Sequence, residues 1–185
     1  KNKLLGVISL GCSKNRLDTE GMLYALLQNG FEITEELDQA DLLIVNTCSF
    51  IQSAKEESID AILQAAEIKS RKEGCKLLVT GCLPERYRDE LARELPEVDA
   101  FVGVNQYGKI VDIVNRMFEG EHIAEFVERA ALPLGRVRTT PKHLAYVRIA
   151  EGCDHACAYC AIPSIRGPYR SRPMEEIVEE CKQLI

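Results

Sequence analysis

The chain has 185 residues, of which 46% are apolar and 28% are charged, and its formal net charge is −6. This is the composition of a soluble globular protein with one hydrophobic core and part of a second. No apolar run approaches the roughly 20 residues of a membrane helix, so we expect no membrane partner. The acidic balance argues against a nucleic-acid interface within these residues and suits a basic protein partner.

Apolar runs and helical patterns alternate along the first two thirds of the chain. This alternation predicts an α/β fold, a parallel sheet with helices on both faces, over residues 1–122. The run Ser53-Ala54-Lys55-Glu56 has the form of a capping box. Strands are predicted at residues 4–10, 42–46, 77–80 and 100–103. Helices are predicted at residues 18–29, from the capping box to Gly74, from Pro84 to Leu95 and at 110–118.

The remaining third of the chain differs in composition and no longer shows this alternation. Residues 123–142 contain prolines and several arginines, and we expect a linker there. A second domain should begin at residues 143–185, with a strand at 144–150, a cysteine-rich loop and a last helix opened by Pro173. One strand and one helix cannot close a barrel, so we expect this domain to be truncated.

Three cysteines of this loop, Cys153, Cys157 and Cys160, have the spacing Cys-x-x-x-Cys-x-x-Cys, and Tyr159 precedes the last one. Structural zinc sites have four protein ligands and often use paired Cys-x-x-Cys motifs. Three thiolates instead suit a 4Fe-4S cluster with one iron left open to a small molecule. We expect such a cluster here; a zinc site or a chance loop are the alternatives.

Three further cysteines, Cys12, Cys48 and Cys82, each follow a predicted strand by a few residues. The carboxyl ends of parallel strands lie at one edge of a sheet, where ligands bind. We therefore expect the three thiols to converge and hold a second metal cluster; the alternative is three buried structural cysteines. Cys75 enters its strand at the amino end and Cys181 lies on a helix face, so we expect both to be core residues.

With both cysteine sets in place, the chain resembles the radical S-adenosylmethionine (SAM) methylthiotransferases. The resemblance implies an amino-terminal Rossmann- or flavodoxin-like domain followed by the start of a radical-SAM partial barrel. The branch that modifies a ribosomal protein is favoured over the tRNA branch by three runs: Ser9-Leu10-Gly11-Cys12-Ser13-Lys14-Asn15, Cys48-Ser49-Phe50-Ile51 and Ala161-Ile162-Pro163-Ser164-Ile165-Arg166-Gly167.

The resemblance also implies a reaction, the methylthiolation of an aspartate β-carbon in a small-subunit ribosomal protein. It implies two 4Fe-4S clusters, SAM bound at the loop cluster with Tyr159 against its adenine, an external electron donor and a sulfur donor. Arg166 and Arg170 follow the loop and are expected either to meet SAM or substrate or to be solvated. A β-carbon has no acidic proton, which is why a radical is needed. We expect a reducing cytoplasm, and no activity from this part alone.

Three alternatives remain open. A tRNA adenosine methylthiotransferase would use the same clusters on a different substrate. A non-catalytic iron–sulfur module would use both cysteine sets for electron transfer alone. A structural zinc protein would bind a colourless metal at the same thiols.

Overall fold

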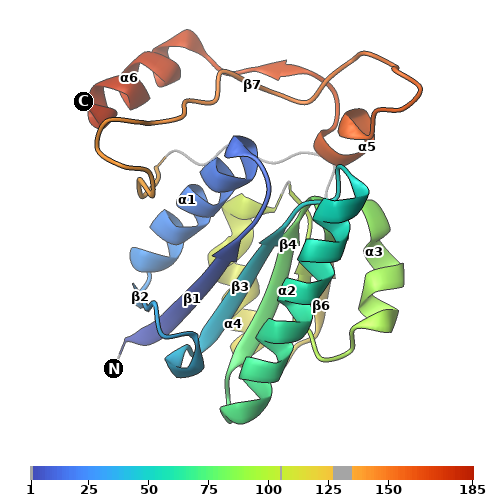
Figure 1. The fold of residues 1–185 in the computed structure, drawn as a ribbon. Helices are drawn as coiled ribbons and strands as arrows, with labels where there is room; N and C mark the ends of the chain where they lie inside the picture. The colour runs from blue at the N-terminus through green and yellow to red at the C-terminus, as the bar shows by residue number, and fades with distance from the viewer. Residues whose placement is uncertain (1, 105, 127–134) are drawn as a thin grey trace.

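The computed structural model describes residues 2–104, 106–126 and 135–185 (Figure 1). Its larger part is a six-stranded parallel sheet with the strand order β2-β1-β3-β4-β5-β6. The first five positions of this order are those of flavodoxin-like sheets, so the predicted fold class is confirmed. The strands are β1 (Lys3–Ser9), β2 (Phe31–Ile33), β3 (Leu42–Thr47), β4 (Lys76–Gly81), β5 (Ala100–Val102) and β6 (Ile123–Glu125).

Helices cover both faces of this sheet, as expected. Side chains of α1 (Ser13–Leu27) and α4 (Ile110–Phe118) pack on one face, and those of α2 (Gln52–Arg71) and α3 (Cys82–Glu94) pack on the other. Successive residues of β3 alternate between the two cores: Ile44 belongs to the first, and Leu43 and Val45 to the second. A strand buried on both faces explains why β3 is a continuous apolar run.

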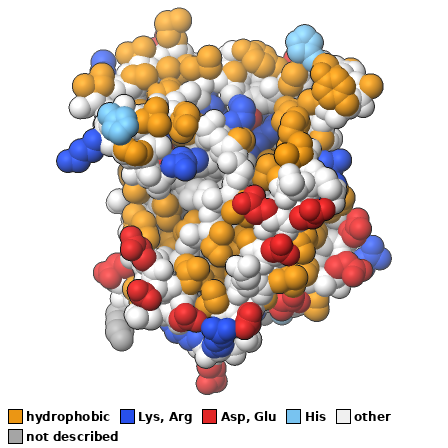
Figure 2. Space-filling view, in the orientation of Figure 1, with side chains coloured by type: hydrophobic (Ala, Val, Ile, Leu, Met, Phe, Trp, Pro, Cys, Tyr) orange, Lys and Arg blue, Asp and Glu red, His pale blue; other side chains and the backbone are white. Residues whose placement is uncertain are grey.

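Residues 135–185 form a smaller part that lies across the carboxyl ends of the strands (Figure 1). It contains two short antiparallel strands, β7 (Ala150–Glu151) and β8 (Arg170–Ser171), and two helices, α5 (Ile162–Arg166) and α6 (Met174–Leu184). Hydrophobic side chains are spread over this part in the view of Figure 2, while acidic side chains gather lower down, over the sheet domain. None of the helices in the described ranges is long and apolar enough to cross a bilayer.

Three local predictions are wrong. The helix α2 begins at Gln52 and is preceded by Ile51, with no side-chain cap, so Ser53 lies inside the first turn and the capping box does not form. The strand expected at 144–150 is reduced to β7, since only its last residue has a strand partner among the described residues. The helix α1 begins at Ser13, five residues before the predicted start. The sequence analysis also missed β2 and β6, and β6 lies in the range expected to be a linker.

Gly81 makes the turn from β4 into α3 possible. Its φ angle is +99°, and a Cβ atom there would lie 2.4 Å from the Thr47 carbonyl oxygen and 2.7 Å from the Thr47 nitrogen. Backbone atoms of a central strand cannot move away to make room. The sequence therefore needs glycine at this position for two independent reasons, conformation and close approach.

We predict that Gly81→Ala lowers the free energy of unfolding by about 2 kcal/mol more than Gly120→Ala does. Gly120 is the matched control, because its φ is +96° but a Cβ atom there meets nothing within 4 Å. Urea denaturation of the two variants measures the difference. Equal losses would show that the strand–helix turn at Gly81 is not as tight as described.

Candidate functional site

The three strand-end cysteines lie at one edge of the sheet. Cys12 separates β1 from α1, Cys48 directly follows β3, and Cys82 is the first residue of α3 after β4. The strands β1 and β3 are neighbours, but the helices that follow them pack on opposite faces of the sheet. This is the topological switch point, where ligands bind in doubly wound sheets. The placement agrees with the sequence analysis; metal binding by these thiols stays a prediction.

The buried Asn15 side chain joins the three strand ends. Its amide nitrogen donates to the carbonyl oxygens of Leu10 (3.1 Å) and Thr47 (2.7 Å). Its oxygen accepts from Arg166 Nη2 at 2.6 Å and from the Cys82 thiol at 3.6 Å. One amide of α1 therefore fixes the ends of β1 and β3 relative to the start of α3.

The backbones at Cys48 and Cys82 are held by serine hydroxyls. The Cys48 N–H donates to Ser58 Oγ (3.0 Å), and the Ser58 hydroxyl donates to the Cys48 carbonyl oxygen (2.8 Å). The Ser49 hydroxyl donates to the Cys82 carbonyl oxygen (2.9 Å). A Cβ atom on Gly11 would lie 3.2 Å from Cys48 Sγ, so glycine lets the chain before Cys12 pass close to that sulfur. These contacts fix the main chain around Cys48 and Cys82.

The protonation of Cys82 reflects its burial. Burial raises the pKa of this thiol to about 11, and the neighbouring Arg166 offsets only part of that rise. Metal ligation requires a thiolate, so a metal would have to displace the proton. Three thiols are the donor set of iron–sulfur clusters and fit such a group chemically. In the ranges described, however, no group of three His, Cys, Asp or Glu side chains is already gathered around a metal-sized space.

The loop cysteines lie nearer the surface. Cys157 is exposed, Cys153 and Cys160 are partly buried, and Tyr159 is 90% exposed. The base of the loop is closed by the Cys153 N–H, which donates to the carbonyl oxygen of Gly167 (3.1 Å). The aromatic side chain is thus available to a ligand rather than packed in the protein. Its contact with adenine remains a prediction.

A buried carboxylate, Asp18, ties this loop to the sheet. Its two oxygens accept from Arg148 Nη2 at 2.5 Å and from Arg166 Nη1 at 2.6 Å. Glu151 lies 3.3 Å from Arg148 and 3.5 Å from Arg166, and Lys14 approaches it at 3.3 Å. This group of charges is buried: less than 10% of the side chain is exposed in Asp18, Arg148 and Arg166. The charges are paired, as burial requires.

The pKa values follow from this pairing. Burial lowers the pKa of Arg166, but Asp18 and the other anionic neighbours outweigh it and hold that pKa well above its ordinary value. Burial raises the pKa of Glu151, but Arg166 and Arg148 outweigh it and leave that pKa below its ordinary value. Glu151 therefore stabilises the folded state above its unfolded pKa, and this contribution is lost as the pH falls through the folded one.

The reading of Arg166 as a solvated residue was wrong, because its side chain is 3% exposed and reaches into the strand-end site. Contact of Arg166 with SAM or substrate stays a prediction. The missed signal lies in α1, where Asn15, Asp18 and Glu20 are buried among apolar residues. A helix whose inner face carries carboxylates needs cationic partners, and the sequence offers arginines after residue 135.

A second buried carboxylate on α1 makes a similar contact. Glu20 is 1% exposed and pairs with Arg136 at 3.0 Å. It also accepts from the backbone N–H of Thr139 (2.7 Å) and its hydroxyl (2.8 Å). Arg136 in turn pairs with Glu180 of α6 at 3.0 Å. The first residues of the smaller part are therefore anchored on α1, and α6 is joined to them through Arg136.

The two remaining cysteines do not join either set. Cys75 is 4% exposed in the core with Leu77 and Val79, and burial raises its thiol pKa. Cys181 is partly buried on α6. The placement of Cys75 agrees with the expectation of a core residue, whereas Cys181 belongs to neither hydrophobic core of the described residues.

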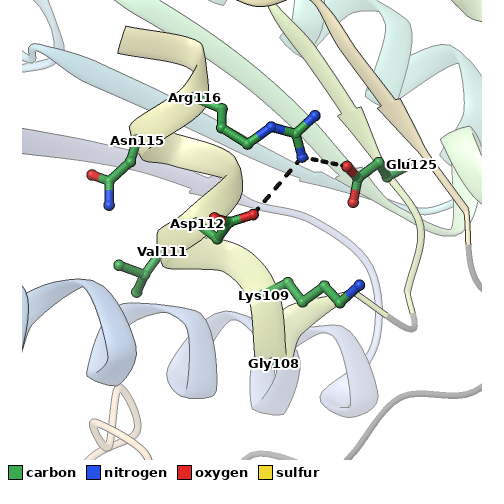
Figure 3. A pocket seen from close by; sticks show the side chains of 7 residues that line it. All are labelled: Gly108, Lys109, Val111, Asp112, Asn115, Arg116 and Glu125. Atoms are coloured by element: carbon green, nitrogen blue, oxygen red, sulfur yellow. Dashed lines mark hydrogen bonds and ion pairs between the residues drawn. The ribbon is translucent and has the colours of Figure 1, made fainter. Parts of the chain in front are cut away.

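A polar hollow between α4 and β6 lacks the features of a catalytic site. Arg116 is one of the side chains that line it (Figure 3). Arg116 pairs with Glu125 at 2.5 Å and with Asp112 at 3.8 Å, so its charge is already neutralised. None of the eight cysteines lines the hollow.

The geometry defines a class: a flavodoxin-like α/β domain with cysteines at its switch point, joined to a cysteine loop by buried ion pairs. A family model described as "Uncharacterized protein family UPF0004" matches residues 5–103. The chain belongs to this family.

Curated relatives extend the match over nearly the whole chain. It is 48% identical over 183 residues to a protein of Symbiobacterium thermophilum, 46% over 188 residues to one of Caldicellulosiruptor saccharolyticus and 50% over 183 residues to one of Clostridium tetani. Each is named "Ribosomal protein uS12 methylthiotransferase RimO". The alignments cover 97% of this chain but 38%, 42% and 40% of these relatives, so the chain spans about two fifths of their length. The resemblance to the ribosomal-protein branch is confirmed.

We predict that iodoacetamide modifies Cys157 on the order of a hundredfold faster than Cys82 in the metal-free protein at pH 8. Cys157 is exposed, whereas Cys82 is 9% exposed and has a raised pKa of about 11. Peptide mass spectrometry after timed quenching measures the rates. Buried Cys75 should react as slowly as Cys82, and all eight cysteines should react alike in urea. Rapid modification of Cys82 in the folded protein would contradict the described burial.

Proposed function

We propose that this chain forms the amino-terminal part of an enzyme that methylthiolates ribosomal protein uS12 at an aspartate β-carbon. The observation that carries the proposal is the presence of two separate three-cysteine sets, one at the strand ends of a flavodoxin-like sheet and one in the segment that lies across them. The similarity to uS12 methylthiotransferases along almost the whole chain supports it. In this proposal the sheet domain, which includes β6, is followed by a linker and by the start of a radical-SAM domain at residues 143–185.

The cysteines would hold two 4Fe-4S clusters. Cys153, Cys157 and Cys160 would ligate the first, and SAM would bind there with its adenine against Tyr159. A second cluster would be ligated by the strand-end set, Cys12, Cys48 and Cys82. When bound, these groups supply electron transfer and radical chemistry that amino-acid side chains cannot perform.

The protein's own residues hold and orient these groups. The loop presents Cys157 and Tyr159 to incoming cofactor, while its base is fixed by the Cys153–Gly167 hydrogen bond. Asn15 and Ser58 fix the strand-end backbone. The reaction further needs an external electron donor and a sulfur donor, and all eight cysteines are free thiols, as suits a reducing cytoplasm.

The first prediction of this proposal concerns iron content. In the anaerobically reconstituted full-length protein, replacing Cys153, Cys157 and Cys160 together by Ala should leave about four irons per chain, because the strand-end set lies on a separate sheet and shares no ligand with the loop. Cys75→Ala and Cys181→Ala are the controls and should keep the full iron content. Iron and absorbance measurements decide. Absence of iron from the triple variant would refute an autonomous strand-end cluster, and a colourless zinc protein would refute both.

The second prediction separates the two sites by activity. In the full-length enzyme, Cys157→Ala should abolish deoxyadenosine formation from SAM. Cys48→Ala should retain deoxyadenosine formation and lose the methylthio product, because its cluster is proposed to handle sulfur. Chromatography of deoxyadenosine and mass spectrometry of uS12 measure both, with circular dichroism to establish folding. The opposite pattern would reverse the assignment.

The same assay separates the alternatives for substrate and class. Methylthiolated tRNA with unmodified uS12 would establish the tRNA enzyme. Two intact clusters without SAM cleavage would establish an electron-transfer module.

A further inference from the structure

One side chain of the cysteine-loop segment enters the strand-end site. Arg166 is the last residue of α5, six positions after Cys160, yet its guanidinium contacts α1 and α3. Nη1 donates to Asp18 at 2.6 Å. Nη2 donates to Asn15 Oδ1 at 2.6 Å and lies 3.7 Å from Cys82 Sγ, within hydrogen-bonding range for sulfur. The segment that carries the cysteine loop thus supplies a buried cation, Arg166, to the strand-end site.

The position of this cation is fixed on two sides. Ile165, the preceding residue, is 2% exposed and packs in the same apolar core as Tyr107 and Cys82. Arg148 holds the other oxygen of Asp18, so that carboxylate cannot turn away. Arg166 therefore reaches Cys82 only when α5 is docked on the sheet domain. Arg148 shares the Asp18 contact but does not touch Cys82, and this difference makes it a matched control.

We propose that Arg166 is a positioning residue that couples the two cysteine sites, holding the first turn of α3 in place and donating a hydrogen bond to the Cys82 sulfur. The proposal rests on the proposed function for its redox consequence. Positive charge and hydrogen bonds at cluster sulfurs raise the reduction potential. A cluster held by the strand-end cysteines would therefore be easier to reduce when the loop segment is docked than when it is not.

The first test needs no metal. In the metal-free full-length protein, Arg166→Gln should speed hydrogen exchange of the Leu83 amide, which donates to Thr47 Oγ1 at 3.3 Å, by about tenfold or more. Arg148→Gln should leave that amide within about twofold of the parent protein. Equal effects of the two variants would overturn the proposal. The Asp18→Asn/Arg166→Gln double variant removes the buried carboxylate together with its partner Arg166, so a folded protein can be compared even when the single variant unfolds.

The second test measures the potential directly. With Cys153, Cys157 and Cys160 replaced by Ala, only the strand-end cluster remains, and its potential can be followed by electron paramagnetic resonance. Arg166→Gln should lower the one-electron reduction constant about tenfold, or about 59 mV. Arg148→Gln should cause a smaller shift, and Arg166→Lys should recover part of the potential but not the Leu83 protection.

The two failures are distinguishable. If no cluster assembles in the protein that lacks only the three loop cysteines, the proposed function fails. Hydrogen exchange then still decides whether Arg166 positions α3. If the cluster assembles but Arg166→Gln and Arg148→Gln give the same potential, the coupling by Arg166 is refuted and the proposed function stands.

Discussion

The arrangement of this protein depends on one buried carboxylate. Asp18 is fully inaccessible to solvent and accepts from two arginines that lie 130 and 148 residues further along the chain. Without both arginines Asp18 would be an unpaired buried charge, and breaking a buried ion pair costs several kcal/mol in proteins. The smaller part can therefore dock on the sheet domain only in an orientation in which both guanidinium groups reach Asp18 on α1. The positions of the cysteine loop and of Cys82 follow from that contact.

The strand-end site illustrates how much a fold can prepare before any metal arrives. The switch point between β1 and β3 lies at the sheet edge, where doubly wound folds bind their ligands. Asn15 and Ser58 satisfy backbone groups there that would otherwise be unpaired. The thiols of Cys48 and Cys82 are nearly buried, and Cys12 is exposed at the rim. A main chain that is already ordered around three thiols is an arrangement that a ligand can complete.

The sequence predicted what depends on local pattern and failed where distant partners decide. The helix at 110–118 and the buried run of β3 have strong periodicity or apolar content, and both were found. Parallel strands end at one edge, so the placement of Cys12, Cys48 and Cys82 was predictable too. The strands β2 and β6 have three residues each, too few for a pattern. The Arg166–Asp18 pair has no local signature, because either residue alone has the sequence context of an ordinary surface side chain.

The polar inner face of α1 also has a consequence for the order of folding. The sheet domain is built from neighbouring β-α-β units, whereas its contacts with residues 136–166 close loops of more than 100 residues. Loop closure over such separations is slow compared with local pairing. We therefore expect the sheet to form during synthesis while Asp18 and Glu20 are still hydrated. Their negative charge would then oppose self-association of this face of the nascent domain until the arginines cover it.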